Sequence, residues 1–538
     1  MSHPLPETGP RKGLRWWPAL AVLLLAGGAI AWLRLRPDWS FQQRNLWTLG
    51  VGLCAGLLLL LWWLTLSRAR WKTRLTVAAA AVAVVGAAAS MFRIRGVSGD
   101  LLPILEPRWA RHGPARAPNR DGGAPSPLAA AAALDFPQFL GPDRTAQLAG
   151  PVLEHDWSAR PPQVLWRQPI GAAWSGWAVV GSRALTQEQR GQEECVTCYD
   201  ALTGRLLWSH ADPARYYTTL AGEGPRCTPT VVSNRVFTLG ATGILNCLDL
   251  ATGRRLWSRD LVSDARSQVP QWGFAGSPLV FEGKVVVSAG GTEGRSLLAY
   301  RADTGEIAWS GGDKPASYGS PFLATLAGVR QILIFNAREI AAHDAGSGRV
   351  LWEYRWGVGQ PNVAVPVVVG ANRVVFSSGY GVGSELLEIN PSADGHLAAS
   401  RVWQSRKMKA KFANLFQREG FLYGLDDGIL ACLDLKDGAQ RWKEGRYGHG
   451  QGLLVRDRLL LMAENGELVL LQPTPDSPHE LSRFRVFKAK TWNPIALAGS
   501  LLLTRNDQEA ACLRVPVETQ AARGSNPKPP QPPTASER

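Results

Sequence analysis

The chain has 538 residues, 45% of them hydrophobic and 19% charged, so it has enough apolar side chains to bury a sizeable core. The formal net charge is +15, but residues 1–120 contain 16 Lys and Arg against four Asp and Glu, which leaves +3 for the remainder. Because the positive charge accompanies long apolar runs, it indicates a membrane region, and a nucleic-acid partner is not expected.

Three apolar runs, residues 17–33, 46–66 and 75–92, predict transmembrane helices within a membrane region of residues 1–92. Each is close to the length that crosses a hydrocarbon core of about 30 Å. The third run consists mostly of Ala and Val, so an arm of a buried hairpin is the alternative for it. The first run is not typical of a cleaved signal peptide, because Leu-Arg-Leu-Arg follows it where a small-residue cleavage site would stand.

The basic residues around these runs predict their orientation. Fewer of them lie between the first and second runs (Arg34, Arg36, Arg44) than before the first run and between the second and third (Arg11, Lys12, Arg15, Arg68, Arg70, Lys72, Arg74). The positive-inside rule therefore predicts a cytoplasmic N-terminus and, after three crossings, an extracytoplasmic remainder. In a Gram-negative cell this is an inner-membrane protein facing the periplasm. If the third run does not cross, the remainder is cytoplasmic.

Two segments have the composition of tethers. Residues 93–134 turn to Pro, Gly, Ala and Arg, which predicts a flexible linker, with a short interfacial piece near residues 101–109 left open. Residues 518–538 are rich in Pro, Ser and Gln, which predicts a disordered tail. A folded domain is expected between them, at residues 135–517.

A decapeptide that ends in Trp recurs through this domain. It reads YDALTGRLLW up to Trp208, and related sequences end at Trp257, Trp309, Trp352 and Trp442. Weaker copies end at Trp166, Trp403 and Phe484, so successive aromatic residues are 42, 49, 52, 43, 51, 39 and 42 residues apart. A period near 45 is typical of one four-stranded propeller blade. Within the unit, Thr-Gly or Ser-Gly makes the turn of a hairpin, and the Trp is buried by stacking of neighbouring blades.

The strand pattern predicts how the ring closes. Three further strands follow each aromatic-ended strand, but the last triplet, from about residue 494 to residue 513, has no fourth strand after it. The segment at residues 164–170 precedes the first triplet and is free to complete the last sheet. Such closure removes exposed sheet edges. The expected fold class is all-β, an eight-bladed propeller of four-stranded blades preceded by three transmembrane helices.

These motifs resemble a known family. The decapeptide is similar to the docking motif Ala-x-Asp-x-x-Thr-Gly-x-x-x-Trp of pyrroloquinoline quinone (PQQ) propellers. The segments FPQFLGPDR at residues 136–144 and GPRCTPTVVSNRVFTLGATGILNCLDLATGRRLW at residues 224–257 are similar to PQQ-binding-like β-propeller proteins, a group that includes relatives of the outer-membrane assembly scaffold BamB. The resemblance covers residues 136–517. It is more specific for fold than for activity.

A candidate ring of site residues follows from the blade frame, because the loop before the first strand of each blade opens on one face of the central channel. This position differs from blade to blade, as a specific pocket requires, and its aromatic and cationic side chains suit a flat or anionic small-molecule ligand. The alternative is that these are ordinary loop residues that rim a wet channel. The candidates are Trp174, Arg226, Trp272, Tyr318, Asn362, Lys411, His449, Trp492 and Asn493.

The cysteines are mostly explained by the repeat. Cys198, Cys247, Cys432 and Cys512 share one repeat position and are expected as small buried residues. Cys195 and Cys198 form C-x-x-C, but no second pair accompanies them for zinc and no His follows for haem attachment. Cys195 and Cys227 lie outside the repeat position, which leaves a disulfide involving one or both open.

The resemblance also implies what an enzyme of this kind contains. In quinoprotein alcohol dehydrogenases PQQ lies between a Trp and a disulfide of two adjacent cysteines, beside a calcium ion held by carboxylates and an Asp that acts as base. This sequence has no Cys-Cys pair, although membrane glucose dehydrogenases of the same family lack it too. Calcium takes several oxygen ligands, whereas the candidate ring offers Asn362 and Asn493 and no carboxylate. No catalytic residue and no metal ligand is therefore assigned.

The sequence is compatible with three functions. The favoured one is a membrane-tethered extracytoplasmic propeller that acts as a non-catalytic binding or assembly scaffold, with other envelope proteins as partners. The alternative is a PQQ- and calcium-dependent dehydrogenase that oxidises alcohols or sugars and passes electrons to membrane quinone. In the third, the three helices of a sensor or anchor are themselves the partner interface. The sequence has no lipoprotein cysteine near its start, so an outer-membrane assembly role is not expected on the pattern of lipid-anchored BamB relatives. Hydrolase motifs such as G-x-S-x-G and H-E-x-x-H are also absent.

Overall fold

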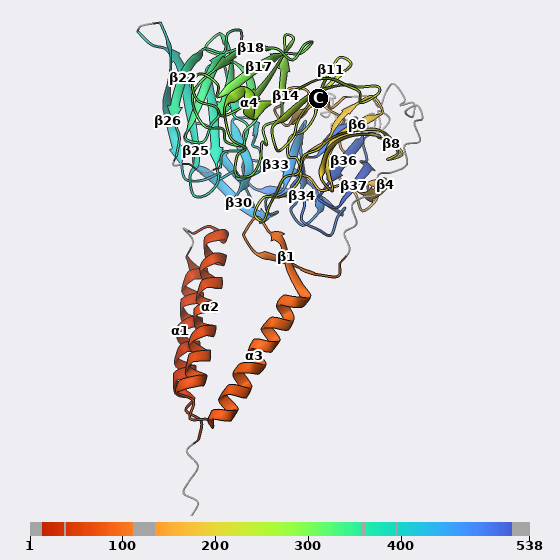
Figure 1. Ribbon diagram of the computed structural model, residues 1–538. Coiled ribbons are helices and arrows are strands. Elements are labelled where there is room, and N and C mark those ends of the chain that lie inside the picture. Colours follow the sequence, from red (N-terminus) through yellow and green to blue (C-terminus); the bar gives the residue numbers. More distant parts are fainter. Residues whose placement is uncertain are drawn as a thin grey trace, which may run out of the picture. The chain divides into compact units, whose positions relative to one another are not determined.

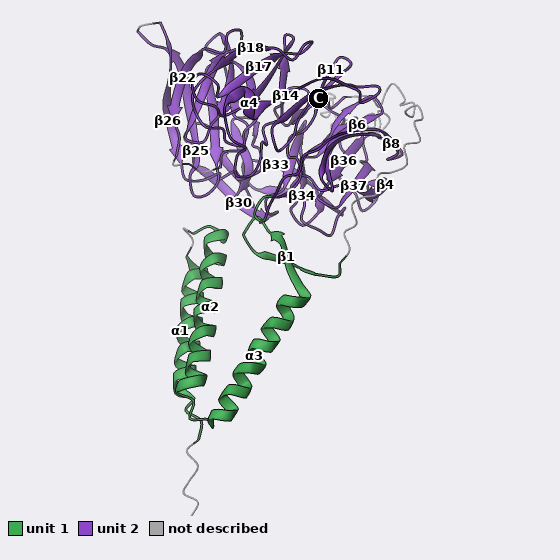
Figure 2. Cartoon of the chain, viewed as in Figure 1, with its two compact units in different colours: residues 1–112, 219–221 green, residues 113–218, 222–538 purple. Residues whose placement is uncertain are grey.

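A computed structural model describes residues 13–36, 39–110 and 135–518, except positions 358, 360 and 394. The chain divides into two compact units (Figure 2). The first contains residues 1–112 with 219–221, and the second contains residues 113–218 and 222–538. Most of the predicted linker, residues 111–134, and the predicted tail, residues 519–538, lie outside the described residues.

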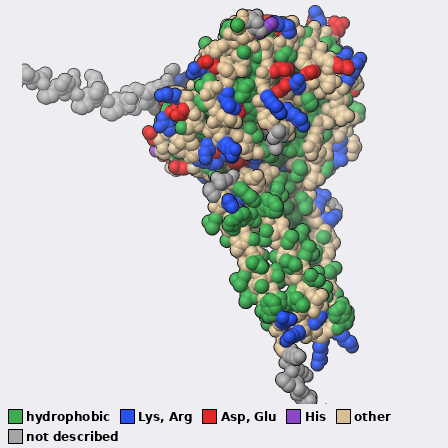
Figure 3. Space-filling model, turned by 90° about the vertical axis from the view of Figure 1, so that its left-hand side faces the viewer, with side chains coloured by type: hydrophobic (Ala, Val, Ile, Leu, Met, Phe, Trp, Pro, Cys, Tyr) green, Lys and Arg blue, Asp and Glu red, His purple; other side chains and the backbone are tan. Residues whose placement is uncertain are grey.

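The first unit contains the three predicted helices, α1 (Trp17–Leu35), α2 (Phe41–Thr65) and α3 (Trp71–Met91) (Figure 1). All three are long and apolar enough to cross a membrane. The start of α2 is fixed by a capping box, in which Ser40 Oγ accepts from Gln43 N and the Gln43 side chain accepts from Ser40 N. α3 buries none of its side chains, and hydrophobic side chains cover the helical unit in Figure 3. So much exposed apolar surface on helices of this length suggests membrane insertion.

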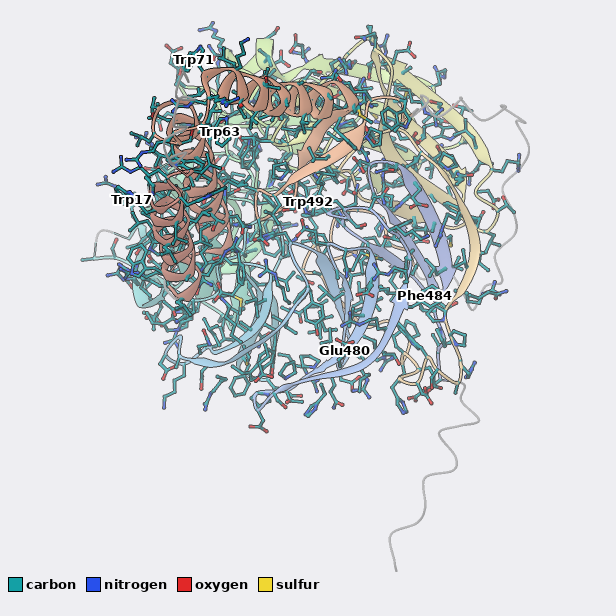
Figure 4. All side chains as sticks on the ribbon, turned by 90° about the horizontal axis from the view of Figure 1, so that it is seen from below. Trp17, Trp63, Trp71, Glu480, Phe484 and Trp492 are labelled. Atoms are coloured by element: carbon teal, nitrogen blue, oxygen red, sulfur yellow. The ribbon has the colours of Figure 1, made fainter. Side chains whose placement is uncertain are left out.

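Tryptophan side chains gather at both ends of these helices. At one end, the ring centroids of Trp16 and Trp62 lie 5.7 Å apart, and Trp17, Trp63 and Trp71 come from the same ends of the three helices (Figure 4). At the other end, the Trp39 ring lies 6.3 Å from that of Trp32 and 6.2 Å from that of Trp47. Two aromatic belts separated by apolar helix are typical of membrane-spanning segments.

The start of the predicted linker is ordered. Instead of a flexible chain, residues 92–107 form an antiparallel hairpin of β1 (Phe92–Val97) and β2 (Pro103–Pro107). Its turn is held by Ser98 Oγ, which accepts from the backbone N–H groups of Asp100 and Leu102. The composition of residues 93–134 as a whole predicts a tether, but apolar and Arg residues alternate over its first positions, and that alternation is a strand pattern.

The second unit is the predicted eight-bladed propeller (Figure 1). Each blade contains four antiparallel strands, and the first of these is called the inner strand. The strands of blades 1 to 4 are β5 (Ala178–Val180), β6 (Arg183–Arg190), β7 (Glu193–Asp200), β8 (Leu206–Asp212); β11 (Thr230–Val232), β12 (Arg235–Leu239), β13 (Ile244–Asp249), β14 (Arg255–Asp260); β15 (Leu279–Phe281), β16 (Lys284–Ser288), β17 (Leu297–Arg301), β18 (Ile307–Gly311); and β19 (Phe322–Leu326), β20 (Val329–Phe335), β21 (Glu339–Asp344), β22 (Val350–Arg355).

Blades 5 to 8 continue the same pattern, and the last one takes its fourth strand from the start of the domain. Their strands are β23 (Val367–Val369), β24 (Arg373–Ser378), β25 (Gly383–Pro391), β26 (Leu397–Ser405); β27 (Phe416–Arg418), β28 (Phe421–Asp426), β29 (Ile429–Asp434), β30 (Gln440–Arg446); β31 (Gln451–Val455), β32 (Arg458–Met462), β33 (Glu467–Pro473), β34 (Pro478–Arg485); and β35 (Ala496–Ala498), β36 (Leu501–Arg505), β37 (Glu509–Arg514), β4 (Gln163–Pro169). The predicted closure is thus confirmed by the pairing of β4 with β37.

The closure is reinforced by buried charges between blades 8 and 1. Arg505 on β36 is fully buried and donates to Gln187 O, Thr186 Oγ1 and Gly171 O. Glu188, also fully buried, accepts from Gly171 N and pairs with Arg190 at 3.0 Å. Burial opposes ionisation of Glu188, but Arg190 and Arg505 hold its pKa below the usual range. The seam therefore carries an ion network in addition to the strand pairing.

Five of the repeat tryptophans pack on a glycine in the hairpin turn of the next blade. Trp208 Nε1 donates to Leu250 O at 3.0 Å, and its ring lies against Gly253, whose φ is +71°. A Cβ at Gly253 would lie 2.3 Å from the indole, so this glycine supplies both the turn conformation and the space for the ring. The same Trp–Gly contact recurs at Trp166–Gly204, Trp257–Gly305, Trp309–Gly348 and Trp403–Gly438.

Three positions depart from this contact. Trp442 Nε1 donates to Thr474 O in the turn of blade 7, which contains no glycine. Trp352 donates to Gln331 Oε1 of its own blade, since the next blade has no Thr-Gly turn between β25 and β26. On β34 the strand register places Ser482, opposite Leu470, at the position of the repeat Trp, so the weak copy expected to end at Phe484, labelled in Figure 4, was assigned two residues too late.

Some elements were not predicted. The sheet of blade 7 gains a fifth, parallel strand, β3 (Gln147–Leu148), beside β31. Short elements lie between blades: β9 (Tyr217–Thr218), β10 (Gly222–Glu223) and the helix α4 (Leu261–Ala265). β3 belongs to a segment of residues 135–157 that we call the strap.

The strap closes one end of the central channel. Phe136 pairs with Val179 of blade 1, and Pro137 O accepts from Val231 N of blade 2. The buried Arg144 donates to Ser277 O and Pro278 O before the inner strand of blade 3, and Ala146 O accepts from Leu454 N of blade 7. Blades 3 and 7 face each other in a ring of eight, so the strap runs across the channel.

Candidate binding site at the channel mouth

All nine candidate ring residues lie in the loops before the inner strands, at the end of the channel opposite the strap. We call this end the mouth. Successive blades supply Trp174, Arg226, Trp272, Tyr318, Asn362, Lys411, His449 and finally Trp492 with Asn493. The residues thus occupy equivalent loops but have different surroundings, and their role in binding a ligand stays a prediction.

The aromatic members form one connected cluster. Trp174 and Trp492, from blades 1 and 8, have ring centroids 5.0 Å apart, and Trp272 and Tyr318, from blades 3 and 4, are stacked at 5.1 Å. Phe412 of blade 6 joins the two pairs, at 5.1 Å from Trp492 and 6.5 Å from Trp272. Phe412 also lies 5.6 Å from His449 of blade 7. Phe412, which directly follows Lys411, was not among the residues predicted from the sequence.

Cationic side chains lie over these and neighbouring rings. Lys490 Nζ lies 3.8 Å from the centroid of Trp492 and 4.8 Å from that of Trp174. Arg226 lies over Tyr216 at 4.6 Å, where burial lowers the pKa of the guanidinium to about 10. Such stacking favours a cation on the ring face. Lys490 and Tyr216 were missed too, because neither stands at the repeat position that defines the ring.

Asn362 and Asn493 are buried and hold backbone. Asn362 Nδ2 donates to Asn336 O at 2.7 Å. Asn493 Nδ2 donates to Ala173 O at 3.0 Å and Ser175 O at 2.8 Å, which ties blade 8 to blade 1. Their amides thus position the loops of the mouth, and the ligand-facing role expected of them remains a prediction.

The acidic groups near the mouth already have partners. Asp427 lies 3.6 Å from the Nζ of the buried Lys411 and 3.7 Å from that of Lys409. Glu464 accepts from His449 N at 2.9 Å. Glu194 accepts from Ala241 N at 3.1 Å, and burial raises its pKa to about 7. Within the described ranges, no three His, Cys, Asp or Glu side chains are grouped so that they could hold a metal ion.

The arrangement can be compared with what PQQ and calcium require. A planar group held between two aromatic rings needs about 7 Å between them, twice the contact distance of about 3.5 Å. The pairs Trp272–Tyr318 and Trp174–Trp492 are closer than this and touch each other directly. Calcium takes six to eight oxygen ligands, and the carboxylates here pair with lysines or backbone N–H groups. In this arrangement neither ring pair has room for PQQ, and the carboxylates that calcium would need already have other partners.

The thiols offer no reactive group at the mouth. All six cysteines of the propeller are buried, and Cys195 and Cys227, for which a disulfide was left open, are both free. Burial raises the pKa of Cys195 to about 11, so it is a neutral thiol at physiological pH.

At the other end of the channel, a cavity of about 60 Å³ lies between the strap and blades 4 to 6, lined by Leu140, Arg144, Phe322, Val365 and Asn414 among others. It has room for about two waters.

Comparisons with known proteins agree with this architecture. The family described as outer membrane protein assembly factor BamB matches residues 160–269 and 192–444. The quinohemoprotein alcohol dehydrogenase ADH-IIG of Pseudomonas putida is 32% identical over 128 residues, 22% of this chain and 17% of the relative. The dehydrogenase subunit of the alcohol dehydrogenase (quinone) of Komagataeibacter europaeus is 31% identical over 121 residues, 20% of this chain and 16% of the relative. The chain therefore matches only about a sixth of the length of these curated relatives.

Two solved structures are similar to this chain at low sequence identity. BamB from Moraxella catarrhalis is 15% identical, with a TM-score of 0.47, over 66% of this chain and 97% of that one. The quinohemoprotein alcohol dehydrogenase of Comamonas testosteroni is 13% identical, with a TM-score of 0.52, over 75% of this chain and 83% of that one. The second similarity supports the propeller fold and says nothing about activity.

Proposed function

Because the chain belongs to the β-propeller family described as outer membrane protein assembly factor BamB, we propose that it is a membrane-anchored scaffold that binds other envelope proteins and catalyses no reaction. The three apolar helices would hold it in the inner membrane, and the distribution of basic residues around them favours an extracytoplasmic propeller.

The main support for this proposal is the packing of aromatic and cationic side chains at the mouth. Its aromatic rings come from six blades and contact one another, with Lys490 and Arg226 stacked on rings of the cluster and its rim. Such a surface offers aromatic and cationic groups to a partner without an open slot for a planar cofactor. Tyr, Trp and Arg are also the side chains that most often dominate the energy of protein–protein interfaces.

A second candidate is a PQQ-dependent dehydrogenase, favoured by the segments that are 31–32% identical to quinohemoprotein and quinone-dependent alcohol dehydrogenases. In that case Trp272 and Tyr318 would have to separate to admit PQQ, and calcium would have to displace the partners of the nearby carboxylates. Arg226 would then face an anionic group of the cofactor.

One experiment separates these functions. The full chain, purified in detergent, is incubated with PQQ and Ca²⁺, passed through a desalting column and assayed for bound PQQ by absorbance and for redox-dye reduction with alcohols or sugars. We expect neither retained PQQ nor dye reduction. Retained PQQ with dye reduction that is lost in Trp272→Ala would overturn the scaffold function and establish the dehydrogenase.

The scaffold function itself is tested by photo-crosslinking in membranes. A photoreactive amino acid replaces Trp492 at the mouth, and the control replaces Leu256, which is exposed on the outer strand β14. We expect a discrete crosslinked partner at the mouth that the control does not capture. Equal patterns at the two positions would contradict a binding role for the mouth. A partner captured instead from Leu57, exposed on α2, would assign the interface to the helices.

A further inference from the structure

The β1–β2 hairpin is amphipathic. Phe92 pairs with Pro107 and Ile94 with Leu105, so these four apolar residues share one face of the ribbon. Leu105 is 63% exposed and Ile94 54% exposed. The paired Arg93 and Glu106 occupy the other face, joined by an ion pair of 2.9 Å. An isolated two-stranded hairpin is marginal in water, and exposed apolar side chains on one of its faces would not stabilise it there.

The hairpin continues directly from a membrane-spanning helix. α3 ends at Met91 and β1 begins at Phe92 (Figure 1). Arg108 ties the two together, because its N–H donates to Met91 O and its Nε donates to Ala89 O and Phe92 O at the end of α3. The Trp109 ring, 62% exposed, lies 6.2 Å from that of Phe92. These two rings therefore stand where α3 leaves the apolar layer.

The hairpin turn lies beside the α1–α2 connection. Asn45 of α2 donates to Asp100 O in the turn and accepts from Arg34 of α1, each at 3.0 Å. Arg36 stacks over Trp32 at 4.2 Å in the same region. The hairpin thus shares its level with the aromatic belt of Trp32, Trp39 and Trp47. Arginines gather at this level: Arg34, Arg36, Arg44, Arg93, Arg95 and Arg108.

We infer that the β1–β2 hairpin lies in the membrane interface and binds the headgroups of anionic phospholipids. Its apolar face, with Phe92, Ile94 and Leu105, enters the boundary of the acyl chains. Arg93 and Arg95 contact lipid phosphates, and Trp109 anchors the end of the hairpin. Exposed apolar area combined with arginine is the composition of interfacial segments, and anionic lipids attract each basic residue near the surface. The inference rests on the membrane insertion that is part of the proposed function.

An environment-sensitive fluorophore at the hairpin tests the inference. The probe is attached to Leu105→Cys in a Cys54→Ser background, where the remaining cysteines are buried. The full chain is reconstituted into nanodiscs of phosphatidylcholine alone or of phosphatidylcholine with phosphatidylglycerol. We expect quenching by a nitroxide at a shallow acyl position, protection from aqueous iodide, and a larger lipid-bound fraction with phosphatidylglycerol.

Charge variants test the headgroup contact. Each arginine near an anionic surface contributes about fivefold to binding, so Arg93→Gln with Arg95→Gln should remove the gain from phosphatidylglycerol. The matched control is Arg70→Gln with Lys72→Gln, the same loss of charge at the opposite end of the helices, and it should leave the gain intact. The headgroup assignment is wrong if phosphatidylglycerol raises the lipid-bound fraction equally in the two double variants. It is also wrong if phosphatidylglycerol does not raise this fraction in the unmodified chain.

A probe on Cys54 separates this inference from the membrane anchor. Cys54 is exposed on α2, within the predicted span. If the probe at position 105 is quenched by iodide while the probe on Cys54 is in lipid, the hairpin inference fails and the anchor stands. If both probes are in water, the anchor fails as well.

Discussion

Aromatic side chains build both the junctions between blades and the channel mouth, but the junctions repeat one contact and the mouth does not. At the junctions, one contact recurs: a Trp ring on the glycine of the next hairpin turn, as at Trp208 and Gly253. At the mouth, the side chain varies from blade to blade, and some contacts join blades that are not neighbours, such as Trp272 with Phe412. Repetition therefore holds the ring together, while the variable positions leave the mouth free to acquire a specific partner. Substitutions should show this division as a difference in stability.

The largest effect is expected at a repeated junction. Trp208→Ala removes a buried indole between blades 1 and 2 and should lower the free energy of unfolding by about 3–5 kcal/mol. The measurement is urea denaturation of the purified full chain. Leu256→Ala, an exposed position on β14, should change it by less than about 0.5 kcal/mol. Equal effects would show that the junction Trp does not stabilise the ring.

The next effect is a pH dependence at Glu194, which lies where the first junction meets the mouth. Its folded pKa, near 7, exceeds its usual value of 4.5, so the folded state keeps a proton that the unfolded state releases between these pH values. Stability should therefore fall as pH rises from about 4.5 to 7, by up to about 3 kcal/mol. Glu194→Gln should flatten this part of the curve in thermal unfolding at a series of pH values. A variant with the unchanged slope would locate the titration elsewhere.

A smaller effect separates the two roles of the junction glycine. Gly253→Ala places a methyl group against Trp208 and should cost about 2–3 kcal/mol through overpacking and positive-φ strain together. The matched control is Gly283→Ala, where φ is +69° and nothing lies within 4 Å of the new Cβ. This control should cost about 1 kcal/mol from the backbone alone. If both variants lose the same amount in urea denaturation, the ring contact contributes nothing.

The smallest effect is expected at the mouth. Lys490→Gln removes a cation stacked on Trp174 and Trp492 and should change stability by less than about 1 kcal/mol. The same variant should weaken crosslinking of the partner from position 492. A loss of stability comparable with Trp208→Ala would mean that the mouth, like the junctions, serves the fold.

Particular residues show how far the sequence could predict this structure. The docking tryptophans, the glycine turns and the completion of the last sheet by residues 163–169 were predictable, because a repeat relates each blade to its neighbour and shows which strand is missing. The three helices followed from length and apolar composition. Residues 93–107 were wrongly expected as part of a flexible linker, because composition averaged over 42 residues hid a short alternating pattern at its start.

The sequence by itself determined the ring, its period, its closure and its apolar anchor, since each depends on local pattern or on one unit repeated beside the next. Only the tertiary structure decided that the strap closes one end of the channel, that Phe412 connects Trp272 with Trp492, and that Lys490 stacks on the mouth tryptophans. These contacts join loops far apart in the chain, at positions the repeat does not relate. Closing the circle brings them together, and no local propensity records which side chains then meet.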